Sequence, residues 1–362
     1  QAESRITYLT DYCGSSIYIK RDDLIPFSFG GNKVRIAEEI FKEIKKGGYT
    51  SVISYGSAGS NMNRAVAAMA KREGIKCYVV IKLEGEAESA DGSDTIVSAS
   101  EEQKVRKWHK LPANEKLVRI AGAEVIYCRG NNVRECVEGV IALSEGRGEK
   151  PYYIYGDSSG KGNELTLMRA SYNEYEEIAA FENEKLKKEA TGEKGSFFDY
   201  LVLTAGTGMT ISGLAAAMQD AGSSAGLVGI SAAREREREL DVIRENLGKF
   251  SEGSSISENY GAGKVTAENN CEASEMPKEP GGGYKLPEIR DDYLCGGYGK
   301  YDKDIEAVIK EAVEAHAVPL DPTYTGKTFY GMLKEIEAGR ISGNVLFIHT
   351  GGYPIYMDYV NK

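Results

Sequence analysis

The chain has few of the residues that mark a metal site, a disulfide-linked fold or a membrane protein. It contains three histidines and six cysteines in 362 residues, and the histidines lack the spacing of metal ligands. The cysteines form no Cys-x-x-Cys pair, which favours reduced thiols over a disulfide framework. No apolar run approaches the ~18 residues of a membrane span, and the first residues do not resemble a signal peptide. These absences predict a cytoplasmic protein without a metal or a membrane segment.

The charge balance points in the same direction. A net charge of −10 argues against nucleic acid or a membrane surface as the partner. The hydrophobic content of 41% is enough for a substantial core, and the length suggests about two domains.

Short apolar runs alternate with stretches of helical periodicity. Five runs predict strands at 51–54, 77–81, 124–127, 201–204 and 345–348. Strands separated by helices favour βαβ units and a parallel sheet, and continuous apolar character fits strands that are covered on both faces. The sequence therefore predicts an α/β protein.

Two segments depart from this pattern. Residues 84–116 are rich in charge, Ser and Ala, and residues 251–287 are rich in Gly, Ser, Glu and Asn. Segments this long between elements are either surface insertions or functional lids, and both interpretations stay open here.

Lys33 is the first candidate for chemistry. It follows Gly30, Gly31 and Asn32 and precedes a helical stretch. The positive end of a helix dipole disfavours an ammonium group and lowers a lysine pKa. A neutral amine is what Schiff-base chemistry needs, although a surface lysine after a glycine turn is the simpler interpretation of this segment alone.

Two further turns join a predicted strand to a helix. In the turn at 55–64, the backbone N–H groups suit a carboxylate, Asn61 could donate to a phenolate oxygen, and Ser60 could relay a proton or act as a nucleophile. Either residue could equally cap the helix. In the turn at 204–210, Gly206, Thr207, Gly208, Met209 and Thr210 suit a phosphate group. This turn is neither a Walker loop nor a complete dinucleotide fingerprint.

The C-terminal third carries tyrosines and threonines between glycines. Tyr298 lies between two glycines, Tyr324 and Thr325 lie in a Pro-containing turn, and Thr350 precedes Gly351 and Gly352. Tyrosines in such places are often packing residues, but they could also stack on a planar ring or hold a proton.

Together these motifs resemble the fold type II pyridoxal-phosphate enzymes, and among them the family of D-cysteine desulfhydrase and 1-aminocyclopropane-1-carboxylate deaminase. The resemblance rests on segments 21–24, 30–33, 321–327 and 349–352, in the family's order. It implies a tryptophan synthase beta-like fold with two open, twisted, mainly parallel sheets and flanking helices. It also implies a large domain of residues 1–46 and 161–362, a small domain of residues 47–160, pyridoxal 5'-phosphate between them, and a homodimer.

The resemblance assigns roles to single residues. Lys33 matches the lysine that carries the cofactor and moves protons, Asn61 matches the partner of the phenolate oxygen, and Ser60 matches the serine near the substrate. Residues 206–210 match the phosphate loop. Tyr298 and Tyr324 match two active-site tyrosines, one of them against the cofactor ring, and either Thr350 or Thr325 faces the ring nitrogen.

The implied reaction is β-elimination from a small amino acid, with D-cysteine as the leading substrate. A hydroxyl cannot keep the ring nitrogen protonated as a carboxylate can, so the ring is a weaker electron sink. The deaminases have Tyr-Glu where this chain has Tyr324 and Thr325, which argues against ring opening of 1-aminocyclopropane-1-carboxylate. The motifs also allow β-replacement, or a protein that binds the cofactor without turnover.

Some positions depart from the family. Met62 stands where His or Gln is usual, residues 156–162 differ from the usual glycine-rich segment, and residues 34–36 are Val-Arg-Ile rather than Thr-Arg-Lys. These changes place the substrate in question but leave the cofactor assignment intact.

Overall fold

The computed structural model describes residues 2–82, 96–98, 107–128, 132–189, 195–254 and 283–362. Large parts of the two segments predicted as insertions or lids, at 84–116 and 251–287, therefore lie outside the described residues. The chain divides into two compact units: unit 1 comprises residues 1–2, 26–166 and 354–362, and unit 2 comprises residues 3–25 and 167–353.

The sheet of unit 1 has the strand order β5-β6-β4-β3-β7. Its strands are β3 (Ser51–Gly56), β4 (Lys76–Lys82), β5 (Ile96–Ser98), β6 (Glu124–Cys128) and β7 (Pro151–Tyr153). All neighbouring pairs are parallel except β5 with β6. Ile53 and Tyr78 are fully buried in this sheet, and each such side chain contributes about 1.5–3 kcal/mol by leaving water.

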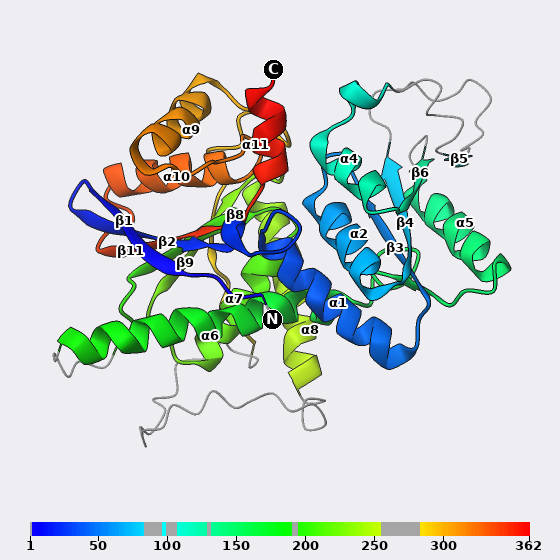
Figure 1. The fold of residues 1–362 in the computed structure, drawn as a ribbon. Helices are drawn as coiled ribbons and strands as arrows, with labels where there is room; N and C mark the ends of the chain where they lie inside the picture. The colour runs from blue at the N-terminus through cyan, green and yellow to red at the C-terminus, as the bar shows by residue number, and fades with distance from the viewer. Residues whose placement is uncertain (1, 83–95, 99–106, 129–131, 190–194, 255–282) are drawn as a thin grey trace. The chain divides into compact units, whose positions relative to one another are not determined.

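Helices α2 (Asn61–Glu73), α4 (Ala113–Ile120) and α5 (Val133–Gly146) pack on this sheet, and α1 (Asn32–Gly47) packs on α2. Unit 1 also contains most of α11 (Tyr353–Val360) and the short η2 (Trp108–Lys110). Figure 1 shows α2 and α4 on one face of the sheet and α5 on the other. The apolar residues of α1 (Ala37, Ile40, Phe41 and Ile44) are all buried, as their helical spacing indicates.

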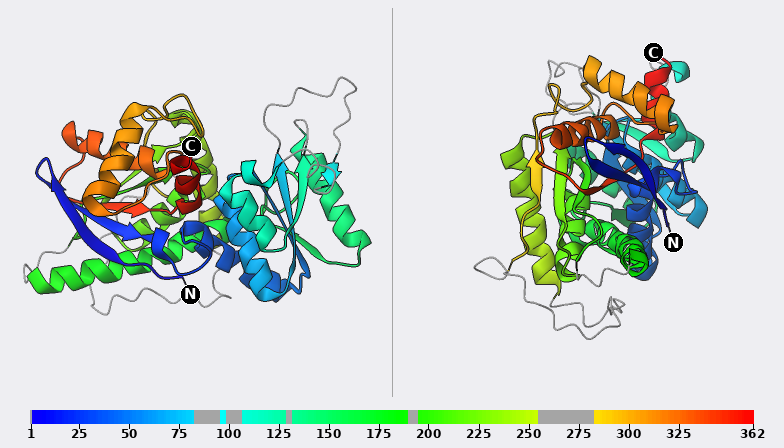
Figure 2. Two further views of the ribbon diagram at one scale, coloured as in Figure 1. Left: turned by 45° about the horizontal axis from the view of Figure 1, so that its top comes forward. Right: turned by 90° about the vertical axis from the view of Figure 1, so that its left-hand side faces the viewer.

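The sheet of unit 2 has the order β1-β2-β11-β8-β9-β10. Its strands are β1 (Ile6–Tyr12), β2 (Ser15–Arg21), β8 (Tyr200–Ala205), β9 (Gly226–Ser231), β10 (Glu288–Arg290) and β11 (Asn344–His349). Only the pairing of β1 with β2 is antiparallel, and this hairpin places β1 at the sheet edge (Figure 2).

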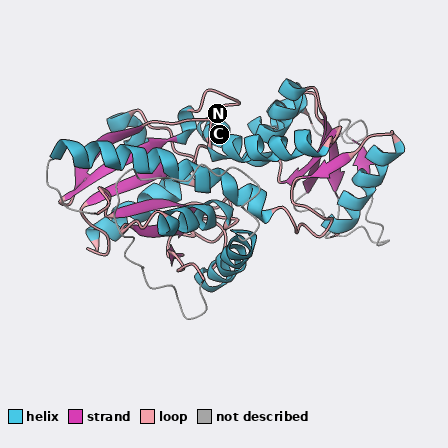
Figure 3. Ribbon diagram, turned by 90° about the horizontal axis from the view of Figure 1, so that it is seen from below, coloured by secondary structure: helices cyan, strands magenta, loops and turns pink. Residues whose placement is uncertain are grey.

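Two helical layers enclose this second sheet (Figure 3). The elements are η1 (Asp22–Leu24), α6 (Glu164–Glu189), α7 (Met209–Asp220), α8 (Arg236–Ser254), α9 (Lys303–His316) and α10 (Thr325–Glu337). Helix α10 packs on β8, β9 and β11, whereas α7 packs on β8 and α8 packs on β10. Figure 1 shows α9 and α10 on one face and α6 and α7 on the other.

The predicted α/β class and all five predicted strands are confirmed. The sequence patterns did not predict β1, β2, β5, β7, β9 or β10. Strand β9 (Gly226–Ser231) contains two glycines, which weaken the strand signal. The fold leaves no room for a side chain at Gly229, because a Cβ there would lie 2.6 Å from Ile211 and 2.8 Å from Ile289.

The prediction of reduced thiols is wrong for two of the six cysteines. Cys128, at the end of β6, and Cys136, in α5, form a disulfide. Their Cα atoms are 6.0 Å apart, a separation typical of disulfides. Cys13, Cys77 and Cys295 are free, and burial raises the pKa of the Cys77 thiol to about 12.

We predict that removing this disulfide destabilises the protein. The bond joins residues 8 positions apart, and a loop of this size corresponds to about 2–3 kcal/mol of stabilisation in the chain-entropy description. The double variant Cys128→Ala, Cys136→Ala should lose that much free energy of unfolding in urea, whereas Cys13→Ala should lose almost none. Alkylation of the denatured protein should label Cys128 and Cys136 only after reduction; labelling without a reductant would contradict the bond.

Candidate functional site

The loop that leads to Lys33 has an unusual backbone. Ser28, Phe29, Gly30 and Gly31 all have positive φ angles, with Gly31 at 95° as the N-cap of α1. Lys33 is the second residue of this helix and is half-buried. It therefore lies at the positive end of the helix dipole, as predicted, and the lowering of its pKa remains a prediction.

Arg64 of α2 holds this loop in place. Its Nη2 donates to the carbonyl oxygen of Gly30 at 3.0 Å, and its Nη1 donates to Ser28 Oγ at 3.1 Å. Arg64 is 2% exposed, and burial lowers its pKa to about 10. The side chain therefore stays charged at neutral pH and makes the bond to Gly30 a charge-assisted one.

The turn between β3 and α2 presents Ser60 and Asn61. Ser60 is the N-cap of α2, and its Oγ accepts a hydrogen bond from the Asn63 N–H at 3.2 Å. A Cβ at Gly56 would lie 2.9 Å from this Oγ, so glycine is required where the chain leaves β3. The hydroxyl proton of Ser60 can still be donated, because the cap uses only a lone pair. Met62 follows in the first turn of α2 and is 8% exposed.

Unit 1 therefore links two of the candidate segments through one helix. Ser60 and Asn61 begin α2, and Arg64, one turn later, bonds to the loop that precedes Lys33. Arg64 was not assigned a role from the sequence, although it ends the segment 55–64. The one feature of the sequence that could have indicated a role for Arg64 is that it is a basic residue in a helical stretch that is otherwise largely apolar.

In unit 2, the turn between β8 and α7 forms an open helix N-terminus. Gly208 is the N-cap in a left-handed conformation (φ 80°), and no side chain caps the helix. A Cβ on Gly208 would lie 3.0 Å from Val242. Arg234 Nη1 donates to the Gly206 carbonyl at 2.7 Å and to Glu239 at 3.0 Å. This arrangement leaves backbone donors and the helix dipole for an anion.

A tyrosine pair lies at the start of α10. The hydroxyl oxygens of Tyr298 and Tyr324 are 2.8 Å apart, close enough to share a proton. The turn before Tyr298 is held by Lys327, whose Nζ donates to the carbonyls of Leu294 at 2.7 Å and Gly297 at 2.8 Å. Lys327 has no exposed surface, and burial lowers the pKa of its ammonium group.

Asp321 organises the turn that carries Tyr324 and Thr325. Its carboxylate accepts hydrogen bonds from the N–H groups of Thr323 at 2.9 Å and Tyr324 at 2.8 Å, and from the Thr325 hydroxyl at 2.8 Å. Thr325 Oγ1 in turn accepts from the Asp321 N–H at 2.8 Å. Burial raises the pKa of Asp321, and these hydrogen bonds oppose that shift. An Asp before Pro in a turn is a recognisable signal for this role.

Thr350 lies at the same sheet edge as the open helix N-terminus. It follows β11, which is parallel to β8 and pairs with it, so both carboxyl ends reach one edge. Its hydroxyl makes no hydrogen bond with the part of the chain that the structure describes. Gly352 lies close against Asp321: a Cβ added at Gly352 would lie 2.3 Å from the Asp321 carboxylate. This contact ties the segment after β11 to the turn of Tyr324.

Each unit thus brings together its own set of predicted residues. Unit 1 holds Lys33, Ser60 and Asn61, and unit 2 holds the turn at 206–210 with Tyr298, Tyr324, Thr325 and Thr350. Among the described residues no group of three or more His, Cys, Asp or Glu could hold a metal ion. No helix in the described ranges is long and apolar enough to cross a membrane.

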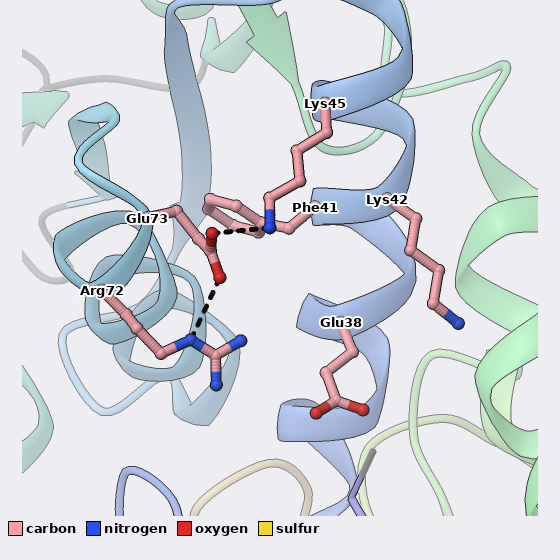
Figure 4. A pocket seen from close by; sticks show the side chains of 6 residues that line it. All are labelled: Glu38, Phe41, Lys42, Lys45, Arg72 and Glu73. Carbon is pink, nitrogen blue, oxygen red and sulfur yellow. Dashed lines mark hydrogen bonds and ion pairs between the residues drawn. The ribbon is translucent and has the colours of Figure 1, made fainter.

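A pocket on unit 1 lies away from Lys33 along α1. It is lined by Glu38, Phe41, Lys42, Lys45, Arg72 and Glu73 of α1 and α2 (Figure 4). Lys45 is twelve positions after Lys33 on the same helix, roughly 18 Å along its axis at 1.5 Å per residue. Glu73 pairs with both Lys45 and Arg72, whereas Lys42 pairs with Glu39 and Glu38 accepts a hydrogen bond from the Ala2 N–H, outside the pocket lining.

An open helix N-terminus at a glycine turn is a common way for α/β proteins to bind phosphate groups. Residues 4–351 match the model of one family, described as pyridoxal-phosphate dependent enzyme. The chain belongs to this family, and its cofactor is pyridoxal 5'-phosphate.

Relatives of known description cover nearly the whole chain. A D-cysteine desulfhydrase of Yersinia pestis (strain Pestoides F) is 26% identical over 358 residues, which is 98% of this chain and 92% of the relative. A putative 1-aminocyclopropane-1-carboxylate deaminase of Pyrococcus abyssi (strain GE5 / Orsay) is 26% identical over 349 residues, which is 96% of this chain and 87% of the relative.

Solved structures show the same fold. The crystal structure of an ACC deaminase homologue matches with a TM-score of 0.72 at 24% identity, covering 100% of this chain and 93% of that one. A hydrogen sulfide-producing enzyme from Fusobacterium nucleatum matches with a TM-score of 0.56 at 16% identity, covering 98% of this chain and 95% of that one. The predicted fold type II architecture is thereby confirmed.

The residues present fit this cofactor. A phosphate group needs several donors and no competing side-chain cap, and the N-terminus of α7 offers both. The Arg234 guanidinium, which also pairs with Glu239, holds the Gly206 carbonyl of this turn. An aldehyde carbon needs an amine, and Lys33 lies in the first turn of α1.

Proposed function

We propose that the protein is a lyase that catalyses β-elimination from a small β-substituted amino acid, with D-cysteine as the leading substrate. The observation that carries the proposal is a threonine hydroxyl, not a carboxylate, at both positions expected to face the ring nitrogen, Thr325 and Thr350. The D-cysteine desulfhydrase relatives support the choice of substrate.

Lys33 is the residue that we propose for attachment and proton transfer. When bound, pyridoxal phosphate supplies a carbonyl carbon that condenses with amines and a conjugated ring that accepts electrons from Cα. Lys33 Nζ would hold the cofactor at that carbon, and as a free neutral amine it would remove the proton from the substrate Cα. The bond from Arg64 to Gly30 fixes the start of its helix.

Two other groups complete the proton path in this proposal. Ser60 Oγ can donate its proton while it caps α2, and the N–H groups of its turn bind the substrate carboxylate. One of the Tyr298 and Tyr324 hydroxyls donates a hydrogen bond to the other, and a phenol of this pair can deliver its proton to the leaving sulfur. In this proposal the turn at 206–210 binds the phosphate group, and Asn61 donates a hydrogen bond to the phenolate oxygen.

Thr350 is the better partner for the ring nitrogen. The Thr325 hydroxyl already donates to Asp321 Oδ2 and accepts from the Asp321 N–H. The Thr350 hydroxyl has no such bond within the described residues. A neutral hydroxyl leaves the ring a weak electron sink, and this favours rapid loss of a β substituent over a long-lived carbanion.

With D-cysteine and water, we predict formation of pyruvate, ammonia and hydrogen sulfide in equal amounts. The C–S bond breaks with its electron pair on sulfur, which takes up a proton, and water then replaces the amine. Keto acid and ammonia release from the purified holoenzyme is the measurement, with L-cysteine in parallel.

The same assay separates β-elimination from the competing functions. Release of keto acid and ammonia from D-cysteine by the unmodified enzyme, but not by the Lys33→Ala variant, supports the proposal. That variant should also lose the lysine-dependent visible absorbance. Incorporation of an added thiol or amine into an amino-acid product, without release of keto acid or ammonia, would indicate β-replacement. Release from 1-aminocyclopropane-1-carboxylate would indicate a deaminase, and a bound cofactor without any release would indicate a binding protein.

A pair of valine variants tests the assignment of the ring nitrogen. Thr350→Val should weaken cofactor affinity by roughly fivefold, the equivalent of about 1 kcal/mol for one hydrogen bond, without changing the unfolding of the apoprotein. Thr325→Val should instead lower the free energy of unfolding by about 1–3 kcal/mol, because it leaves buried partners on Asp321 unsatisfied. A stable Thr325→Val protein with weakened cofactor binding would contradict the assignment.

We also propose that the enzyme is a cytoplasmic homodimer. The resemblance of its motifs to the family supports this, and burial of Cys128 and Cys136 protects their disulfide from cellular thiols. Sedimentation equilibrium should give twice the chain mass of 39.4 kDa; a single chain mass at micromolar concentration would contradict the dimer.

A further inference from the structure

Asn114 is a buried side chain in contact with Asn61. It lies in the first turn of α4, is 1% exposed, and belongs to a segment for which the sequence suggested only an insertion or a lid. Its Nδ2 donates to the carbonyl oxygen of Gly59 at 2.7 Å and to Asn61 Oδ1 at 2.9 Å. Both contacts lie within unit 1.

The chemistry of these contacts fixes the orientation of two amides in turn. A backbone carbonyl can only accept, so the Asn114 atom that faces Gly59 must be the NH₂ group. The second hydrogen of that NH₂ group points to Asn61, so the Asn61 atom in contact must be its carbonyl oxygen. Asn61 Nδ2, with two hydrogens to donate, is therefore on the side away from Asn114.

The reversed orientation is unfavourable. Turning the Asn114 amide over would place its oxygen against the oxygen of Gly59, and the Asn61 contact would then also require a reversal. In the observed orientation Asn114 Oδ1 is buried and has no hydrogen-bond partner among the described residues. One unpaired acceptor is tolerated here because the reversed amide would bring two acceptors into contact.

The start of α4 is itself held in place. The N–H group of Ala113 donates to both carboxylate oxygens of Asp358, at 3.0 and 2.9 Å. Helix α4 packs on α2, and Val118 is 1% exposed. Asn114 thus contacts the Gly59–Asn61 turn from a fixed position.

We propose that Asn114 is a positioning residue that orients Asn61 so that its NH₂ group, not its oxygen, faces the phenolate oxygen of the cofactor. The inference rests on the proposed role of Asn61. A donor beside that oxygen stabilises its anionic form, and an acceptor there would repel it. Asn114 therefore acts on the cofactor through Asn61 and without touching it.

The test uses Asn114→Asp, which has nearly the same shape and loses both N–H donors. Asn132→Asp is the matched control, because Asn132 caps α5 as an acceptor, a role that aspartate keeps. Two quantities are measured on the holoenzymes: pyridoxal phosphate affinity, and the pH midpoint at which the visible cofactor band changes. Both are independent of turnover.

We expect Asn114→Asp to weaken cofactor affinity about tenfold and to raise the pH midpoint by about one unit, since one pH unit is a tenfold change in the equilibrium. Asn132→Asp should change neither quantity. In an Asn61→Ala background, Asn114→Asp should have no further effect on the midpoint, a coupling that a purely structural role would not produce.

Three outcomes would overturn the inference. An unchanged pH midpoint in Asn114→Asp, together with a shifted midpoint in Asn61→Ala, would exclude the positioning role of Asn114 and keep the role of Asn61. An unchanged pH midpoint in Asn61→Ala would exclude the proposed roles of both Asn61 and Asn114. Keto acid release from D-cysteine would then still support the proposed β-elimination. If Asn114→Asp fails to fold, Asn114→Ser removes the same two contacts without adding a charge; an unchanged midpoint there has the same meaning.

Discussion

The candidate site depends on side chains, three of them buried and one half-buried, that donate hydrogen bonds to the carbonyl groups of glycine-containing loops. The pairs are Arg64 with Gly30, Asn114 with Gly59, Arg234 with Gly206, and Lys327 with Gly297. In each case the loop carries or precedes a residue proposed for chemistry. Glycine allows the backbone to turn sharply, but it offers no side chain to hold the turn and loses the most entropy when ordered. A donor from a neighbouring element supplies that restraint.

Placing these donors beside the loops removes two of them, Arg64 and Lys327, from water. Arg64 and Lys327 lose their hydration, and burial lowers the pKa of both. Arg64 keeps its charge at neutral pH because its pKa of about 10 lies well above 7. Hydrogen bonds to charged groups contribute about 1.5–3 kcal/mol each, enough to hold one conformation of a short loop. The same restraint would orient catalytic groups before the substrate arrives.

Much of the fold could be predicted from the sequence, because buried parallel strands give continuous apolar runs. The weaker strands gave no such signal: β9 contains glycines, and β10 has three residues. The disulfide was missed because sequence spacing does not show that Cys136 lies beside Cys128 in the fold. Of the site, the segments with Lys33, Ser60 and Thr350 could be found, since their glycines and polar residues follow predicted strands or precede helices.

The sequence by itself determined the α/β class, the positions of the loops that carry the chemistry and, through resemblance, the cofactor, because these depend on local periodicity and short motifs. Only the tertiary structure decided which side chains hold those loops and which hydroxyls remain available. Asn114 and Asn61 are 53 residues apart in the chain, and Asp321 engages Thr325 but leaves Thr350 without a bond in the described structure. Donor–acceptor geometry between distant residues exists only once the helices and strands have packed.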